Sequence, residues 1–381
     1  MVERVYADRT VKQLIGTTIA KKYYVRDVLG RGGNAVVYEA LDRIMTRSVA
    51  IKVPMLDRVD ADADNVLRRF RREVRTSAAV AHPNVCLSHD AGQLDDGTPF
   101  LVTERLEGES LEQRLRRESS LSLSRAIAIF SQVLSALAAS HARRIVHRDI
   151  KPANIFLSRV AGYEELVKVL DFGASKRLGG SLDPDDDDAP EEELTAAGFV
   201  FGTPYYMAPE QIRGESIDTR ADLFACGAVL FEALAGERLY RSHTPEEIFR
   251  EVLAAPARTV RSVKPSLPAE VDAVVRRALR RNPEDRYPTS AAFRRELQSL
   301  GPLAHPSDKT RLVSTDENAT AARLTDLKLQ FHELAGRHRA MRESMQKSSR
   351  FVDSEGSIPS VVDEDVDGTI TTQQRNIRPK L

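Results

Sequence analysis

Two short stretches of the chain carry side chains that can do chemistry together. Asp149, Lys151 and Asn154 lie close to one another around Pro152, and Asp171 follows further along the chain. A carboxylate can orient a hydroxyl, an amide and a second carboxylate can hold a metal ion, and an ammonium can meet developing phosphate charge. These residue types predict phosphoryl transfer from a magnesium-bound nucleotide. A polar turn between two strands is the structural alternative.

The bulk properties exclude several other classes of protein. The chain has 381 residues, of which 41% are hydrophobic and 29% charged, as in an ordinary soluble globular protein. Its formal net charge of zero predicts no attraction to nucleic acid or to a membrane surface. Two cysteines are too few for a disulfide framework, which favours a cytoplasmic location. We expect no signal peptide and, because we find no run of about 18 apolar residues, no membrane-spanning helix.

The first part of the chain reads as β-strands joined by a glycine-rich turn. Runs of β-branched and aromatic residues predict strands over 23–29, 36–40 and 49–53. The turn between the first two lets backbone N–H groups approach a phosphate without obstruction by a Cβ atom. An ordinary glycine-rich hairpin is the alternative. The turn comprises Gly30, Arg31, Gly32, Gly33, Asn34 and Ala35.

Lys52 lies on the third predicted strand and has two interpretations. It can point into solvent on an alternating strand, or it can bind the α- and β-phosphates of a nucleotide, which requires a carboxylate partner. Residues 64–80 show a helical pattern with an apolar stripe at positions i, i+4 and i+8. Glu73 flanks this stripe and should face inward, so we expect it to pair with Lys52.

The rest of the chain up to residue 300 is mainly helical in pattern. A buried strand is expected over 100–106. Apolar stripes at helical spacing then predict a series of helices. These cover residues 124–144, 223–234, 246–253, 269–279 and 290–300.

The segment His147–Asn154, followed by Asp171-Phe172-Gly173, resembles the catalytic and metal-binding loops of the eukaryotic-like (Hanks-type) Ser/Thr protein kinases, in their soluble bacterial form. The resemblance implies an α+β bilobal fold. Its smaller lobe has an antiparallel β-sheet with one helix, and its larger lobe is mainly α-helical. We place the small lobe at 21–106 and the large lobe at 107–301, after a lead-in at 1–20.

The resemblance also implies roles for the residues of these loops. Asp149 would be the base or hydroxyl-positioning group, and Lys151 would neutralise the transferring γ-phosphate and indicate Ser/Thr specificity. Asn154 and Asp171 would be the Mg²⁺ ligands, with Mn²⁺ as a substitute, because both supply hard oxygen ligands. His147 would be a buried structural residue.

A larger set of residues would surround ATP if the resemblance holds. Thr103 would be the gatekeeper beside the adenine, and the backbone of Glu104 and Leu106 would bind its edge. The predicted ATP-binding residues are Leu29, Gly30, Arg31, Gly32, Gly33, Asn34, Ala35, Val37, Ala50, Lys52, Glu73, Thr103, Glu104, Leu106 and Phe156.

Two positions depart from the family pattern. Ala35 stands where the third glycine of the loop is usual, and its methyl group is expected to stiffen the loop. Ser77, one turn after Glu73, replaces an apolar residue of the internal hydrophobic spine, so the active position of this helix would be weakly supported.

The segment from Asp171 to Glu210 carries the candidate on-switch. By resemblance Thr195 would be the activating phosphorylation site, with Thr203 as a second candidate. Arg148 supplies a guanidinium that could pair with a phosphate there. The acidic run 183–193 is expected to be a solvated insert, or alternatively to contact the arginine-rich helix at 64–80.

Three further residues have structural roles by resemblance. Asp222 would hold the backbone of the catalytic loop, and Glu210 would pair with Arg286 inside the large lobe. Residues 202–210 match the part of the family that forms a peptide-binding ledge.

The resemblance ends beyond Leu300, at a linker and amphipathic helix expected over 302–348. Apolar residues from 324 to 345 follow a heptad pattern, which predicts a coiled coil that forms a homodimer or, alternatively, a helix packed on the large lobe. Residues 349–381 are expected to be a disordered tail.

The favoured function is therefore an ATP-dependent Ser/Thr protein kinase that is activated by its own phosphorylation and acts in signal transduction on protein substrates. A pseudokinase that serves as an interaction scaffold is the alternative. A kinase for a small molecule is a third possibility, against which the match over 202–210 argues.

Overall fold

The structure is a computed structural model that describes residues 14–32, 35–55, 63–159, 165–172, 176–177, 204–254 and 257–303. These residues belong to one compact unit, Met1–Ala335. Several predictions made above lie outside the described residues. They concern Gly33, Asn34, Thr195, Thr203, the acidic run 183–193, the heptad pattern 324–345 and the tail 349–381.

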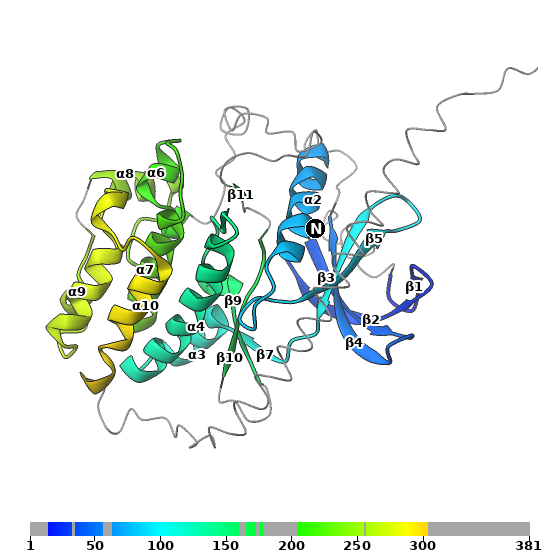
Figure 1. The fold of residues 1–381 in the computed structure, drawn as a ribbon, viewed down its shortest axis with the longest axis horizontal. Helices are drawn as coiled ribbons and strands as arrows, with labels where there is room; N and C mark the ends of the chain where they lie inside the picture. The colour runs from blue at the N-terminus through cyan, green and yellow to red at the C-terminus, as the bar shows by residue number, and fades with distance from the viewer. Residues whose placement is uncertain are drawn as a thin grey trace, which may run out of the picture. The chain divides into compact units, whose positions relative to one another are not determined.

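A six-stranded antiparallel sheet forms the small lobe, with strand order β1-β2-β3-β4-β6-β5 (Figure 1). The three strands predicted in the first part of the chain are present, and residues of the expected lead-in add the short strand β1. The strands are β1 (Thr18–Ile19), β2 (Tyr23–Arg31), β3 (Ala35–Asp42), β4 (Arg47–Pro54), β5 (Ser88–Gln93) and β6 (Pro99–Glu104).

Alternation along the strands gives the sheet two different faces. Val36, Tyr38 and Ile51 are buried together on one face, because residues two apart on a strand point the same way. The residues between them lie on the other face, where Val37 is paired with Lys52 across the β3–β4 ladder. The face with Lys52 is therefore the one that this apolar cluster does not fill.

The helix α2 (Ala63–Ala79) lies against this second face (Figure 1). Phe70 and Val74 pack on Leu101 of β6 in a small buried cluster. The helix ends before His82-Pro83, since a proline disfavours helical geometry in the residue before it. The predicted helix is confirmed to within one residue at each end.

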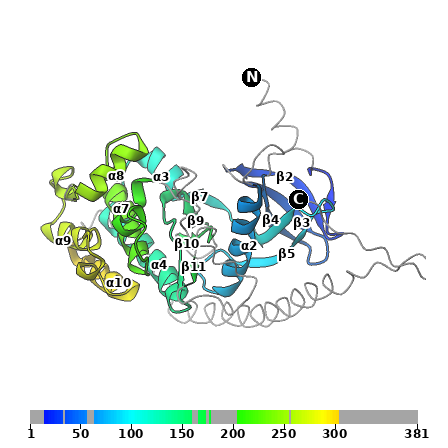
Figure 2. The ribbon, with the colours of Figure 1, turned by 90° about the horizontal axis from the view of Figure 1, so that it is seen from above.

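Helices make up most of the large lobe, and α4, α7, α9 and α10 are grouped together when seen from above (Figure 2). The α-helices are α3 (Leu111–Glu118), α4 (Leu123–His141), α6 (Pro209–Ile212), α7 (Arg220–Ala235), α8 (Pro245–Ala254), α9 (Ala269–Ala278) and α10 (Ser290–Gln298).

Short strands and turns complete the large lobe. A three-stranded sheet has the order β10-β9-β7, and β11 pairs with β8. The strands are β7 (Gly108–Ser110), β8 (Ile145–Val146), β9 (Ile155–Ser158), β10 (Leu166–Val169) and β11 (Lys176–Arg177). The 3-10 turns are η1 (Pro152–Asn154), η2 (Pro204–Tyr206), η3 (Val260–Ser262), η4 (Pro283–Asp285) and η5 (Gly301–Leu303).

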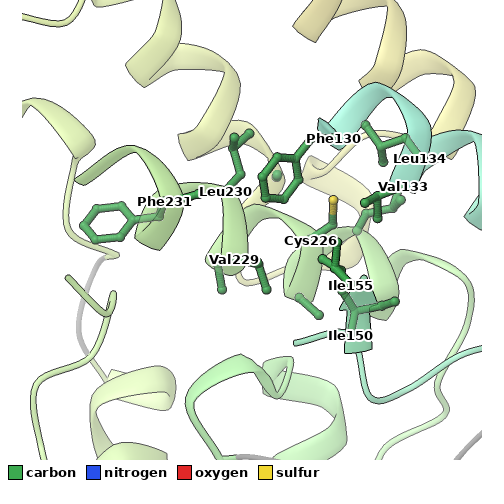
Figure 3. Packing of buried hydrophobic residues seen from close by; sticks show 14 of the residues in the cluster. Phe130, Val133, Leu134, Ile150, Ile155, Cys226, Val229, Leu230 and Phe231 are labelled. Carbon is green, nitrogen blue, oxygen red and sulfur yellow. The ribbon is translucent and has the colours of Figure 1, made fainter. Parts of the chain in front are cut away.

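The core of the large lobe lies between α4, α7 and the segment that will form the catalytic loop. Figure 3 shows Phe130 and Val133 of α4 close to Cys226 of α7, with Ile150 and Ile155 nearby in the same buried cluster. The loop therefore begins and ends on side chains fixed in the core, which limits its freedom to move.

The helix α4 is the one helix in the described part of the chain that is long and apolar enough, by length and composition, to cross a membrane. It is not an uninterrupted apolar run, because it contains Arg125, Gln132 and four serines, and it meets the criterion only on its average composition. Its apolar side chains, among them Phe130 and Leu137, are buried against the rest of the large lobe. The structure uses α4 as a core helix, whose stripe serves packing rather than contact with lipid.

Contacts between the segment that follows α2 and the large lobe tie the two lobes together. Asn84 Nδ2 donates to Val167 O at 2.9 Å, and Cys86 N donates to Val169 O at 3.0 Å. Lys168 Nζ, which is buried, donates to Glu104 Oε1 at 2.6 Å. The end of β6 is thus bound to β10, and the sheet meets the helical lobe at a fixed point.

Candidate active site

Lys52 is the centre of the small-lobe part of the site. Its Nζ donates to Glu73 Oε1 at 2.6 Å and to Asp171 Oδ1 at 2.6 Å. The first contact joins β4 to α2, the second joins the small lobe to the large one. Sequence reasoning had paired Lys52 with Glu73 but had not placed Asp171 beside it.

The charges of these three groups depend on one another. Burial lowers the pKa of Lys52, but the carboxylates of Asp171 and Glu73 together raise it above its ordinary value. Burial raises the pKa of Glu73, and Lys52 offsets this only in part, since the nearby charge of Asp171 raises it further. Lys52 therefore remains a cation at neutral pH, the state that can pair with phosphate.

Asp149 is held by the two residues that were expected to accompany it. Lys151 Nζ donates to Asp149 Oδ2 at 2.7 Å. Asn154 Nδ2 donates to the same oxygen at 3.1 Å and to the main-chain oxygen of Asp149 at 2.8 Å. The turn η1, which starts at Pro152, brings Asn154 back to the carboxylate. A carboxylate oriented in this way can accept a hydrogen bond from an acceptor hydroxyl.

The backbone of this loop is bound to a carboxylate in the core. Asp222, which is fully buried in α7, accepts from His147 N at 2.9 Å and from Arg148 N at 2.8 Å. Arg148 has a φ of 67°, a left-handed conformation that residues other than glycine rarely adopt. The two hydrogen bonds to a buried charge stabilise this conformation.

His147 links the catalytic loop to the segment that carries Asp171. Its Nδ1 accepts from Asp149 N at 3.3 Å and its Nε2 donates to Leu170 O at 2.9 Å. The imidazole also lies 4.6 Å from the ring of Phe172, measured between centroids. His147 is fully buried, so it positions its neighbours and is not available as a base.

Asn154 and Asp171 offer oxygen ligands that fit magnesium. Leu170 N donates to Asn154 O at 2.9 Å, so Asp171 follows directly after a residue bound to Asn154. The described residues contain no cluster of three or more His, Cys, Asp or Glu side chains able to hold a metal. An amide and a carboxylate without a closed cage suit Mg²⁺, which keeps water and phosphate oxygens in its shell.

Most of the described residues predicted to surround ATP lie on the second face of the sheet or at its junction with the large lobe. Arg31 is the exception, because it is paired with Val36 and so lies on the first face. Ala50 is paired with Thr103 across β4 and β6, and Gly30 with Val37 across β2 and β3. Glu104 N donates to Leu87 O at 2.9 Å, so its amide already has a partner. Leu29 and Arg31 end β2, Leu106 follows β6, and Phe156 lies on β9.

The two departures from the family pattern are both visible. Ala35 is the first residue of β3, and its carbonyl accepts from Gly32 N at 2.9 Å. Ser77 is buried, and its Oγ donates to Glu73 O at 2.6 Å within α2. Thr76 Oγ1 also reaches Phe172 O at 3.3 Å, a contact between α2 and the Asp171 segment that sequence reasoning had missed.

The structure brings Glu210 and Arg286 together deep in the large lobe. Arg286 NH1 and NH2 donate to the two oxygens of Glu210 at 2.6 and 2.7 Å. The same guanidinium donates to main-chain oxygens of Arg220, Arg280 and Arg281. This bidentate pair fixes α6, and with it the segment around Tyr206 that leads to the site.

Two observations define the class of protein. A sheet lobe presents a lysine held by a glutamate of its one helix. A helical lobe presents Asp149 and Asn154 in contact with each other and Asp171 in contact with that lysine. This is the arrangement of an ATP-dependent phosphotransferase with the bilobal kinase fold.

Comparison with known proteins agrees with this class. The family described as protein kinase domain matches residues 23–297, and the chain belongs to this family. The predicted fold class and the resemblance to protein kinases are therefore confirmed.

Three curated relatives of the chain come from bacteria. It is 35% identical over 314 residues to serine/threonine-protein kinase pkn3 of Myxococcus xanthus, covering 82% of this chain and 56% of that protein. It is 32% identical over 309 residues to serine/threonine-protein kinase PrkC of Bacillus subtilis, with 81% and 45% covered. It is 34% identical over 282 residues to serine/threonine-protein kinase PknB of Mycobacterium tuberculosis, with 73% and 43% covered. The chain thus spans about half the length of these relatives.

Proposed function

We propose that the chain transfers the γ-phosphoryl group of Mg·ATP to serine or threonine hydroxyls of proteins. The observation that carries the proposal is the Lys52 ammonium, held at 2.6 Å from both Glu73 and Asp171. This contact between the lobes supports a phosphate-binding role for Lys52 and a metal-binding role for Asp171. The names of the relatives support Ser/Thr specificity.

The proposed reaction makes a bond between the acceptor oxygen and the γ-phosphorus and breaks the bond from that phosphorus to the bridging oxygen, which leaves with ADP. Asp149 orients the acceptor hydroxyl and receives its proton, and Lys151 meets the charge on the transferring group. Asn154 and Asp171 would hold Mg²⁺, which would neutralise phosphate charge when bound. Mn²⁺ offers the same charge and similar oxygen chemistry.

The scaffold alternative has no support from the described site. All five residues on which catalysis would depend are present, namely Lys52, Glu73, Asp149, Asn154 and Asp171. Lys52 contacts Glu73 and Asp171. Asp149 contacts Asn154 and also Lys151. Activation through Thr195, self-association through 324–345 and a cytoplasmic location remain proposals that rest on the sequence alone.

Incubation of the purified chain with Mg·ATP tests the proposal. The intact mass should rise by whole phosphate increments on the chain or on a generic acceptor protein, and fragmentation should place them on serine or threonine. Asp149→Asn should abolish the rise, because an amide cannot take the proton. Asp95→Asn, in the exposed turn between β5 and β6, is the matched control and should not change it. Equal incorporation by the Asp149 variant, or none by the unmodified chain, would overturn the proposal.

A further inference from the structure

Asp222 has a third partner besides the amides of the catalytic loop. His141, the last residue of α4, places its Nε2 2.7 Å from Asp222 Oδ2. The other ring nitrogen, Nδ1, lies 2.9 Å from the Oγ of Ser290, the first residue of α10. A string of hydrogen bonds therefore runs from α10 through α4 and α7 to the amides of His147 and Arg148.

The burial of these side chains shows that the string of hydrogen bonds has a structural function inside the protein. Serine, histidine and aspartate in this order also form the hydrolytic triad, which is recognised by geometry and access. Here Ser290 is 2% exposed and Asp222 is 0% exposed, so no substrate can reach the hydroxyl. The function of this string of hydrogen bonds must therefore depend on the backbone amides of His147 and Arg148, which Asp222 binds.

The hydroxyl of Ser290 is not needed by its own helix. The residue before it, Thr289, caps α10, and its Oγ1 accepts from Ala292 N at 3.1 Å. Ser290 Oγ is therefore free to serve the imidazole of His141 instead of an unsatisfied amide of the first helical turn. If packing were the only requirement at the start of α10, a residue without a hydroxyl would serve at this position.

The chemistry of the three side chains decides which of them donates and which accepts in each hydrogen bond. The ionised carboxylate of Asp222 can only accept, so His141 Nε2 carries a hydrogen. Ser290 can donate to Nδ1 of the neutral ring, which fixes both the ring orientation and this tautomer. Burial would raise the pKa of Asp222, but the hydrogen bonds from His141 and from the amide of His147 hold it below its ordinary value. The carboxylate thus stays charged and oriented where it binds the loop.

We propose that Ser290 and His141 are positioning residues for phosphoryl transfer. They hold the carboxylate of Asp222 in the orientation that fixes the amides of His147 and Arg148, and through them the carboxylate of Asp149. The catalytic consequence rests on the proposed kinase function, whereas the effect on the loop amides does not.

The test compares Ser290→Ala with Ser290→Thr in the full chain. Ser140→Ala is the matched control, because Ser140 precedes His141 in α4, is fully buried and donates only to Leu137 O of its own helix at 3.0 Å. Amide hydrogen exchange of the peptide that contains residues 146–150 is measured for each variant, together with kcat and the KM for ATP.

We expect Ser290→Ala to speed exchange at the loop amides about 3- to 10-fold, the effect of one net hydrogen bond. It should lower kcat by a similar factor without changing the KM for ATP, since the loss affects orientation at the reacting hydroxyl. Ser290→Thr should restore both values, and Ser140→Ala should change neither. In a His141→Ala background, Ser290→Ala should have no further effect.

Loop amides that exchange equally fast in the unmodified chain and in Ser290→Ala would overturn the inference, whatever the kinase activity. An equal change in Ser140→Ala would also overturn it, because the effect would then be general loosening of α4. A chain that incorporates no phosphate at all but shows the exchange difference would refute the proposed function and leave the string as a structural support of the loop.

Discussion

Lys52 is the residue on which the site depends most, because one ammonium serves carboxylates from both lobes. Because the ammonium also contacts Asp171, it stays bound when Glu73 is removed. The two single substitutions at this pair should therefore differ in their effect.

We predict that Lys52→Met lowers the rate of phosphate incorporation by about 100-fold or more, and Glu73→Gln by only about 10-fold. Removing Lys52 deletes the cation itself, whereas the glutamine variant leaves Lys52 held by Asp171. Initial rates with labelled ATP measure both. Equal losses would show that Asp171 does not hold the lysine during catalysis.

His82 is a titratable residue at the junction of the lobes. Burial and the nearby cations Lys168, Arg143 and Arg294 lower the pKa of His82 to about 4. Its Nδ1 accepts from Asn84 N at 3.1 Å, and its Nε2 lies 3.3 Å from Ser135 Oγ. The folded protein thus keeps this ring neutral at pH values where the unfolded chain protonates it.

This difference predicts a pH dependence of stability. The unfolded chain binds the proton below about pH 6.5 and the folded protein only near pH 4, so the free energy of unfolding falls as pH drops through this window. His82→Gln should reduce that fall by about 1–2 kcal/mol, after allowance for partial exposure. Urea unfolding at pH 7, 6, 5 and 4 measures it. His243→Gln, at an exposed position, is the control, and an identical pH profile for both variants would contradict the prediction.

Among the elements, α7 is buried along almost its whole length and carries Asp222 into the site. Its close approach to α9 depends on Gly227. A Cβ atom at this position would lie 2.8 Å from the Cβ of Ala278 and 3.4 Å from Leu279 Cδ2. Such distances require one helix to shift.

We predict that Gly227→Ala destabilises the protein by about 1–3 kcal/mol, although alanine is normally preferred over glycine inside a helix. The shift of α7 would also displace Asp222, so kinase activity should fall with stability. Thermal and urea unfolding measure the first effect. Gly301→Ala, where nothing lies within 4 Å of an added Cβ, should be nearly neutral, and an equally neutral Gly227 variant would contradict the packing argument.

The helix α2 is attached in a different way from α7. Its buried apolar contacts to the sheet are few, and polar contacts add to them, namely the Lys52–Glu73 pair and the hydrogen bond from Thr76 to Phe172. Ser77 has a hydroxyl in place of an apolar side chain, and this hydroxyl donates a hydrogen bond to the carbonyl of Glu73. Polar contacts of this kind depend on the state of their partners, so we expect α2 to shift more easily than α7.

For the molecule as a whole, the pair of Glu210 and Arg286 shows how the large lobe is held together. Both side chains are buried, with Arg286 2% and Glu210 2% exposed. Breaking such a pair leaves a charge without a partner inside the protein, whereas replacing both residues by apolar ones avoids that cost.

We predict that Glu210→Leu or Arg286→Met alone destabilises the protein by about 3–5 kcal/mol, and that the double variant is less destabilised than the sum of the two. Urea unfolding of the four proteins gives the coupling energy. Glu284→Ala, which removes an exposed partner of Arg220, is the control and should change stability little. Strict additivity would show that the pair contributes nothing as a unit.

The sequence by itself determined the class of protein and the main elements, and it nominated the residues that we propose to react. Residue types with a fixed chemistry at short spacing, such as Asp149, Lys151 and Asn154, can be interpreted without a fold. Periodicity located α2, α4 and α7, because burial of one face imposes a period on the sequence. The short strands of the large lobe carried no such period and were not predicted.

The resemblance to kinases predicted the pairs Lys52–Glu73 and Glu210–Arg286, but only the tertiary structure decided other contacts across long separations. The contacts of Lys52 with Asp171, of Lys168 with Glu104 and of Ser290 with His141 join segments that no local pattern relates. Each is a polar contact made by residue types that are common on surfaces. Their burial and partners follow from how the helices and sheets pack, since packing alone sets which side chains are removed from water together.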